Sequence, residues 1–264
     1  MKVGFIGTGN MGSALARAVS RTGCAEILLY DKNEDKARAL AEDIGAVATD
    51  LATLAAEANI IFLGVKPNIL PFLLRDLSPI FRARPDLTLV SMAAGVAISK
   101  IEESLGFRAP VIRIMPNTPV AYGRGMILYS ASENVSPAVL EQFEKILERA
   151  GTLDRINESL IDAGSAISGC GPAFAYMFLE ALADGGVAAG LPRDKALAYA
   201  ARMLEGAAVT ALESGEHPGR LKDAVCSPGG STIEGVVTLE DGGFRGVVSE
   251  AVIAAYEKTV ALGK

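Results

Sequence analysis

A loop of small and hydroxyl-bearing residues is the part of this sequence best suited to holding a ligand. It runs Ser227-Pro228-Gly229-Gly230-Ser231-Thr232, between two helical patterns. Gly229 and Gly230 leave the backbone uncrowded and permit positive φ, while Ser231 and Thr232 supply hydroxyls that can cap the helix predicted to begin near residue 233. Backbone N–H groups at a helix N-terminus attract anions, so the loop suits a carboxylate. An ordinary helix connection with a good cap has the same pattern, and the loop alone does not separate the two.

A glycine-rich loop near the N-terminus predicts a second site. Gly7-Thr8-Gly9-Asn10-Met11-Gly12 follows a short apolar run and opens a helical pattern, which is the context that G-x-G-x-x-G requires for dinucleotide binding. Gly7 permits the tight turn, Gly9 lets a pyrophosphate approach the backbone, and Gly12 lets the helix pack closely on the strand. Asp31 follows the next predicted strand at the spacing typical of the acid that hydrogen-bonds an adenine ribose. The segment therefore predicts a dinucleotide-binding site.

Up to residue 158, strand and helix signals alternate along the chain. Strands are predicted near residues 2–6, 26–30, 59–64, 87–91, 111–115, 125–130 and 152–156. Helices are predicted near residues 10–21, 34–43, 51–57, 68–83, 97–105 and 136–149. This alternation is typical of a doubly wound parallel sheet, to which the late strands are expected to add an edge of mixed direction. We therefore expect an α/β Rossmann-type dinucleotide-binding domain over residues 1–158.

From about residue 160 the strand signals stop. Helices are predicted near residues 160–190, 193–214, 219–225, 231–239 and 245–262, with a kink or restart at Gly171-Pro172. Many apolar positions carry small residues that let helices approach closely. A helical segment of this length has a small core of its own, so we expect residues 159–264 to form an all-helical dimerisation domain. A monomeric helical bundle is the alternative.

Composition and charge exclude several classes of function. The chain has 264 residues, of which 50% are apolar and 21% charged, enough for a sizeable core. Its net charge of −6 offers no basic stripe to nucleic-acid phosphates. Three widely spaced cysteines, Cys24, Cys170 and Cys226, argue against disulfides and metal sites and fit a reducing cytoplasm. We expect no secretory signal, because the glycine loop interrupts residues 1–20, and no apolar run near the roughly 18 residues of a membrane span.

Several further segments match the pattern of a known family. In chain order they are Val65-Lys66-Pro67, Met92-Ala93-Ala94-Gly95-Val96, Arg113-Ile114-Met115-Pro116-Asn117-Thr118-Pro119, Ser168-Gly169-Cys170-Gly171-Pro172-Ala173, Ala183-Asp184-Gly185-Gly186-Val187, Leu191-Pro192 and Leu221–Gly235. With the glycine loop, they make the sequence resemble the pyrroline-5-carboxylate reductases over nearly its whole length. The order of the segments and the Leu221–Gly235 stretch carry most of the resemblance.

The resemblance implies an oxidoreductase that reduces 1-pyrroline-5-carboxylate to L-proline, the last step of proline biosynthesis, by hydride transfer from NAD(P)H to the cyclic imine carbon. It also implies a cytoplasmic homodimer joined through the helical domain. Thr232 is the expected catalytic residue, with its hydroxyl near the imine nitrogen. The expected substrate-binding residues are Val225, Ser227, Gly229, Gly230, Ser231 and Thr232. The expected cofactor-binding residues are Gly7, Thr8, Gly9, Asn10, Met11, Gly12, Asp31, Lys32, Val65, Lys66, Pro67, Met92, Ala93, Ala94 and Asn117.

The choice between NADPH and NADH stays open at this stage. The charge of Asp31 favours NADH because it repels a 2′-phosphate, whereas Lys32 and Asn33 beside it can accept one. His217, the one histidine, precedes Pro218 at a helix start and is expected to cap the turn rather than act as a base. Met177 stands where the family often has a hydroxyl residue, so no second hydrogen bond is expected there.

Three other functions fit parts of the sequence. A β-hydroxyacid dehydrogenase shares the domain order, but Ile167–Leu182 contains no lysine or arginine to serve as its base. A non-catalytic NAD(P)-binding protein has no need of the Ser227–Thr232 loop, although fold alone does not exclude it. A reductase of a related cyclic imine remains an alternative.

Overall fold

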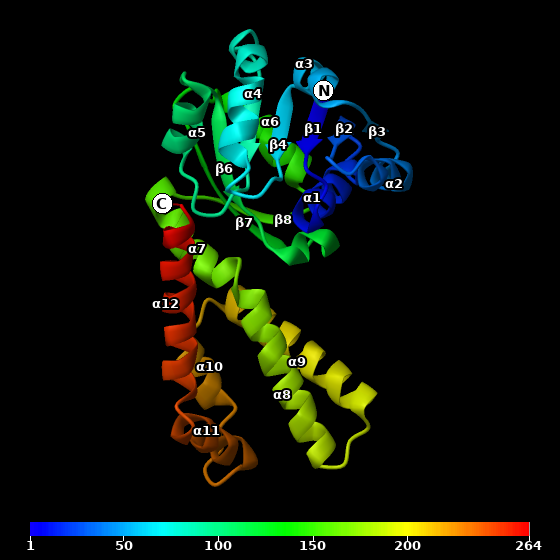
Figure 1. Cartoon of the computed structure of the whole chain (residues 1–264). Coiled ribbons are helices and arrows are strands. Elements are labelled where there is room, and N and C mark those ends of the chain that lie inside the picture. The colour runs from blue at the N-terminus through cyan, green and yellow to red at the C-terminus, as the bar shows by residue number, and fades with distance from the viewer. Residues whose placement is uncertain (264) are drawn as a thin grey trace. The chain divides into compact units, whose positions relative to one another are not determined.

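The computed structural model describes residues 1–263, which divide into two compact units (Figure 1). One unit contains Met1–Cys170 together with the end of the chain from Ala254, and the other is Gly171–Ile253. All the strands of the described residues belong to the first unit, and the second consists of helices and their connections. The predicted fold class, an α/β sheet region followed by a helical region, is confirmed.

The first unit is built on an eight-stranded sheet in the order β3-β2-β1-β4-β5-β6-β7-β8. Its strands are β1 Lys2–Ile6, β2 Glu26–Tyr30, β3 Val47–Ala48, β4 Ile60–Leu63, β5 Thr88–Ser91, β6 Val111–Met115, β7 Gly125–Ala131 and β8 Gly151–Arg155. Neighbouring strands are parallel, except that β7 runs antiparallel to β6. The predicted mixed edge is therefore confirmed. Of these strands, only β3 was not predicted, because a strand of two residues is too short to show an alternating apolar pattern.

Helices cover both faces of the sheet. One buried cluster joins the sheet to α1 Asn10–Ser20, α2 Glu34–Ile44 and α6 Pro137–Leu147. The other joins it to α3 Leu51–Glu57, α4 Leu70–Arg82 and α5 Ile98–Leu105. The central strand β4 is buried at every position, which is what a parallel strand covered on both faces requires. The 3₁₀ turns η1 Thr118–Tyr122 and η2 Glu158–Leu160 and the helix α7 Ile161–Ser168 complete this part of the chain.

A buried arginine ties β6 to the segments that follow the sheet. Arg113 is 2% exposed, and its guanidinium donates a hydrogen bond to Asp162 on α7. The same guanidinium lies 3.6 Å from Oε1 of Glu158. That oxygen also accepts a hydrogen bond of 2.7 Å from the backbone N–H of Ile98, the first residue of α5. One cation thus neutralises two carboxylates that join β6, α5 and α7.

The second unit has almost no core in a single copy of the chain. It contains α8 Gly171–Ala188, α9 Arg193–Ser214, α10 Pro218–Ala224 and α11 Ser231–Asp241, and α12 Phe244–Leu262 begins in it. Within Gly171–Ile253 only Ala183, Ala196 and Ala200 are buried. Large apolar side chains there are exposed, among them Tyr176, Met203 and Leu212. So much exposed apolar surface marks an interaction face.

The helix predicted over residues 160–190 is two helices. α7 ends at Ser168 and α8 restarts at Gly171, with Pro172 in its first turn, where the missing N–H is harmless. The expectation that no stretch approaches a membrane span was too strict. Glu158–Ala188 has the length and composition to cross a membrane, at a mean hydropathy of 1.3. Its exposed apolar face has a second explanation, which is contact with another copy of the chain.

Candidate active site

The glycine loop has the geometry of a pyrophosphate cradle. Gly7 has φ +97°, and a Cβ added there would lie 2.7 Å from the carbonyl oxygen of Gly64. A Cβ added at Gly12 would lie 2.1 Å from the carbonyl oxygen of Gly7. In contrast, a Cβ added at Gly9 meets nothing within 4 Å. Gly7 and Gly12 are therefore required by packing, whereas Gly9 keeps open the space that a ligand needs.

The N-terminus of α1 is free to bind an anion. Gly9 is its N-cap, and within residues 1–263 no side chain caps the helix. Gly9 and Asn10 are exposed, so the first backbone N–H groups of α1 face solvent. Unpaired N–H groups and the positive end of the helix dipole are what phosphate oxygens require. The loop thus fits the dinucleotide predicted from the sequence.

Asp31 is hydrogen-bonded to the glycine loop. Its Oδ2 accepts from the backbone N–H of Thr8 at 2.7 Å and from the Thr8 hydroxyl at 3.0 Å. Its Oδ1 accepts from the backbone N–H of Asn33 at 2.9 Å. Burial raises the pKa of this carboxyl, but the hydrogen bonds from Asn33 and Thr8 outweigh it, so the pKa lies below its ordinary value. The carboxylate stays charged at neutral pH, and one lone pair of Oδ1 is left for a ribose hydroxyl.

The other predicted cofactor segments lie at the same edge of the sheet. Val65–Pro67 follows β4, which neighbours β1 in the sheet order, and Met92–Ala94 follows β5, which neighbours β4. Ligands bind at the carboxyl ends of the strands in this architecture. A hollow of about 540 Å³ there is lined in part by Lys66, Pro67 and Ala94, so the structure brings these residues together. Lys32 and Lys66 are exposed and lie beyond β2 and β4.

Asn117 has its amide engaged inside the protein. Its Oδ1 accepts from the backbone N–H of Met126 at 2.9 Å, and its Nδ2 donates to the carbonyl oxygen of Ser168 at 2.9 Å. The side chain is 9% exposed. Asn117 therefore braces the start of β7 against the end of α7. Any role toward the cofactor would be indirect.

The loop after β5 is held by the end of the last helix. Gly95 has φ +74°, and a Cβ added there would lie 2.6 Å from the carbonyl oxygen of Thr259 and 2.7 Å from the nitrogen of Gly263. The backbones of two segments far apart in sequence therefore touch, and only glycine permits it. The sequence analysis did not predict this contact. Gly95 and Gly263 lie far apart in the chain, and no local sequence pattern indicates that they meet.

Gly95→Ala is expected to destabilise the protein more than Gly106→Ala does. Gly106 has φ +72°, but a Cβ there has only an arginine nitrogen at 3.7 Å as neighbour. Both changes carry the left-handed backbone cost of about 1–2 kcal/mol, and only Gly95→Ala adds overpacking of about 1–3 kcal/mol. Chemical denaturation of both variants at equal protomer concentration measures the difference. Equal losses of unfolding free energy in the two variants would show that the close approach at Gly95 does not contribute to the cost of the substitution.

The predicted substrate residues lie together in the second unit. Val225 is the C-cap of α10, which ends at Ala224. Ser227, Gly229 and Gly230 belong to the connection to α11, and Ser231 and Thr232 form the start of its first turn. The expected capping by Ser231 and Thr232 is wrong. The helix begins at Ser231 with Gly230 as N-cap, two residues before the start near residue 233 on which the capping prediction rested, and Gly229 at φ +65° makes the turn that precedes it.

This early start leaves the hydroxyls of the loop available. Ser231 and Thr232 are exposed, and neither side chain is hydrogen-bonded to another described residue. The N–H groups of the first turn of α11 are likewise without a side-chain cap within residues 1–263. A helix N-terminus with two free hydroxyls can bind a carboxylate and donate one further hydrogen bond.

The described residues indicate neither a catalytic histidine nor a metal ion at this site. His217 caps α10 as predicted, with Nδ1 accepting from the backbone N–H of Gly219 at 3.1 Å. Among residues 1–263, no group of three or more histidine, cysteine and carboxylate side chains is placed to hold a metal ion.

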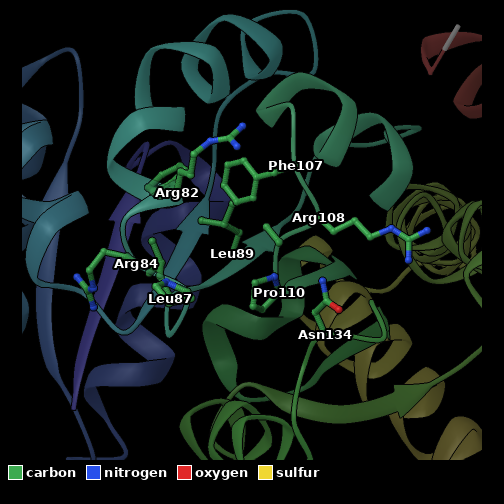
Figure 2. Close-up of a pocket in the computed structure, with 11 residues that line it drawn as sticks. Arg82, Arg84, Leu87, Leu89, Phe107, Arg108, Pro110 and Asn134 are labelled. Carbon is green, nitrogen blue, oxygen red and sulfur yellow. The ribbon is translucent and has the colours of Figure 1, made fainter.

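A second hollow, of about 290 Å³, lies at the opposite edge of the sheet (Figure 2). It is lined by Leu87 and Pro110, which precede β5 and β6, and by three arginines. Figure 2 shows the guanidinium groups of Arg82, Arg84 and Arg108 pointing in different directions. Arg82 stacks on Phe107, and Arg84 pairs with Asp86. This hollow is therefore no anion site in the present conformation.

Comparison with known proteins agrees with this geometry. A family model described as pyrroline-5-carboxylate reductase dimerisation matches residues 158–262, and one described as NADP oxidoreductase, coenzyme F420-dependent, matches residues 2–95. The pyrroline-5-carboxylate reductase of Escherichia coli (strain K12) is 40% identical over 100% of this chain and 98% of its own. The chain belongs to the pyrroline-5-carboxylate reductase family. The pea (Pisum sativum) member is 39% identical over 97% of this chain and 94% of its own.

A solved member of the family has the same fold throughout. The Plasmodium falciparum pyrroline carboxylate reductase, with NADP bound, has a TM-score of 0.91 at 32% identity and covers 100% of this chain and 98% of that one. Membership confirms an NAD(P)H-dependent oxidoreductase that works on a small molecule. It also explains the second unit, because the dimerisation region covers the helices whose apolar side chains are exposed in one copy. The chain forms a homo-oligomer through them.

Proposed function

We propose that this protein reduces 1-pyrroline-5-carboxylate to L-proline with a hydride from NAD(P)H. Full-length identity of 40% to a named pyrroline-5-carboxylate reductase is the observation that carries the proposal. Two features of this chain support it independently. The space in front of Gly9 is open, and the hydroxyls of Ser231 and Thr232 are free. A protein that only bound the dinucleotide would need the first feature and not the second.

The residues of this chain divide the work between binding and orientation. The backbone N–H groups of α1 bind the pyrophosphate, and the segments after β4 and β5 line the nicotinamide end. The first turn of α11 holds the substrate carboxylate, and the Thr232 hydroxyl donates to the imine nitrogen. When bound, the reduced nicotinamide supplies the hydride. Holding both reactants in place can contribute about 7–11 kcal/mol to lowering the barrier, so the chemistry asks little more of the side chains.

We also propose a role for each domain and a cellular location. Residues 1–158 act as the dinucleotide-binding domain, and residues 159–264 act as the substrate-binding and dimerisation domain. The protein works in the cytoplasm, a location that its free cysteines, Cys24, Cys170 and Cys226, fit.

A turnover assay tests the proposal. Purified protein is mixed with 1-pyrroline-5-carboxylate and NADH or NADPH, and absorbance of the reduced nicotinamide is followed while proline is measured. We expect cofactor oxidation and proline formation in equal amounts. Cofactor binding without proline, but with turnover of another cyclic imine, would favour the reductase of a related imine. Binding without any turnover would overturn the catalytic proposal.

Thr232→Ala is expected to lower kcat about 100-fold, as loss of a positioned hydrogen-bond donor does, with cofactor Kd unchanged. Thr238→Ala is the matched control, because Thr238 lies on the same helix and its hydroxyl donates to the carbonyl oxygen of Glu234. That control should keep full activity. Steady-state kinetics of both variants measure the effect. An unchanged kcat for Thr232→Ala would remove the role assigned to its hydroxyl.

A further inference from the structure

A hollow of about 300 Å³ lies beyond β2, where Asp31, which is hydrogen-bonded to Thr8 of the glycine loop, forms part of its lining. The adenosine half of a dinucleotide is expected at this end of β2. It is bounded by Asp31 after β2, by Glu34 in the first turn of α2 and by Asp50 after β3. The cation that lines it is Arg38. Three carboxylates and one guanidinium give this wall a net negative charge.

The carboxylate of Asp31 is fixed in place. Three hydrogen bonds from Thr8 and Asn33 hold it at the end of β2, with a pKa below its ordinary value. A side chain on the surface could turn away from an incoming phosphate. Asp31 cannot do so without breaking its bonds to the glycine loop.

The other two acids and the arginine are also engaged. Asp50 caps α3, accepting from the backbone N–H of Thr53 at 2.9 Å and from its hydroxyl at 2.6 Å. Glu34 pairs with Arg38 one helical turn later. The cation in the wall is therefore already neutralised by a carboxylate of the same wall, and it offers a phosphate little net attraction.

The remaining basic groups nearby do not line the hollow. Lys32 and Lys36 are exposed, and neither is among the lining residues. Asn33 is the N-cap of α2, with Oδ1 accepting from the backbone N–H of Lys36 at 3.3 Å. Of the two residues that the sequence offered as acceptors of a 2′-phosphate, Asn33 is thus engaged as a helix cap and Lys32 lies outside the lining of the hollow.

We propose that this wall makes NADH the preferred cofactor, with Asp31 and Glu34 setting the preference. The inference rests on the proposed function and names its cofactor. A ribose 2′-hydroxyl donates a hydrogen bond to a carboxylate, whereas a 2′-phosphate brings about −1.5 to −2 charges against three acids. Like charges at an interface cost affinity for the wrong partner, so the wall selects against NADPH.

Direct binding tests the inference without any substrate. NADH and NADPH are titrated separately into the full-length protein, and nicotinamide fluorescence gives each Kd. We expect NADPH to bind at least about tenfold more weakly than NADH. Raising the salt concentration should narrow this ratio, because screening weakens exposed charges. Equal affinities, or tighter NADPH, would overturn the proposal.

Three variants assign the effect to residues. Asp31→Asn and Glu34→Gln should each reduce the NADPH-to-NADH Kd ratio at least about threefold. Glu42→Gln is the matched control, because Glu42 lies on the same helix, is exposed, does not line the hollow and, unlike Asp35, is not paired with Arg38. It should leave the ratio unchanged. Asp31→Asn also weakens the tie to Thr8, so both affinities can fall, and the ratio is the quantity that decides.

The outcomes separate this inference from the proposed function. If neither Asp31→Asn nor Glu34→Gln changes the ratio more than Glu42→Gln does, the wall does not set the preference. If the protein binds NADH tightly yet forms no proline, the reductase activity fails while the cofactor preference stands. Proline formed faster with limiting NADPH than with limiting NADH would contradict the preference and leave the activity intact.

Discussion

Replacing Gly9 by valine is expected to weaken NADH and NADPH binding at least about 100-fold, a loss of about 2.8 kcal/mol, while leaving the fold intact. A Cβ added at this position meets no protein atom within 4 Å. Its φ of −66° and ψ of −172° suit an ordinary L-residue. The added methyl groups therefore enter only the space that the pyrophosphate needs. Fluorescence titration measures binding, and thermal unfolding checks the fold.

Gly12→Ala is the matched comparison for this prediction. Its Cβ would lie 2.1 Å from the carbonyl oxygen of Gly7, so the helix and the strand must separate. We expect Gly12→Ala to lower stability by about 1–3 kcal/mol, an effect that Gly9→Val does not share. Normal cofactor affinity in a folded Gly9→Val protein would mean that the pyrophosphate lies elsewhere.

Arg113→Met is expected to lower the free energy of unfolding by about 3 kcal/mol. The substitution removes the cation between Asp162 and Glu158 and leaves two carboxylates close together. Both are partly exposed, at 22% and 31%, so water offsets some of the loss. The buried Nε of Arg113 has no hydrogen-bond partner among the described residues, so removing that atom breaks no hydrogen bond. Denaturant unfolding at fixed protomer concentration measures the change.

Arg149→Met serves as the control for Arg113→Met. Arg149 forms an exposed ion pair of 3.8 Å with Glu148, a kind of contact worth about 0–1 kcal/mol. Adding Asp162→Asn to Arg113→Met should recover part of the stability, because one unpaired charge is removed. If Arg113→Met and Arg149→Met lose the same small amount, the buried cluster does not hold β6 to α5 and α7.

The fold was predictable because its signals are local. Buried strands such as Ile60–Leu63 are continuous apolar runs, and the glycine loop has a fixed spacing that only one local structure satisfies. The residues of both loops could therefore be named from sequence. The helix break after Ser168 was also readable, since Gly171 and Pro172 favour the start of a helix over its interior.

The tertiary roles were not predictable, because they depend on partners far away in the chain. Asn117 donates a hydrogen bond to the carbonyl oxygen of Ser168, and the backbone of Gly95 lies against that of Gly263. No residue spacing in the sequence indicates either contact. Asp31 has the position of a ribose ligand, but the structure adds its bonds to Thr8. The capping error at Ser231 arose because a hydroxyl pattern was preferred to the turn that Gly229 makes.

A label-transfer experiment tests the central claim most directly. The protein is incubated with 1-pyrroline-5-carboxylate and NADH carrying deuterium at the transferable position of the nicotinamide, and the product is analysed by mass spectrometry and NMR. The account predicts L-proline with one deuterium on the ring carbon that was the imine carbon. Proline without deuterium, or no proline from a protein that binds NADH and is folded, would contradict it.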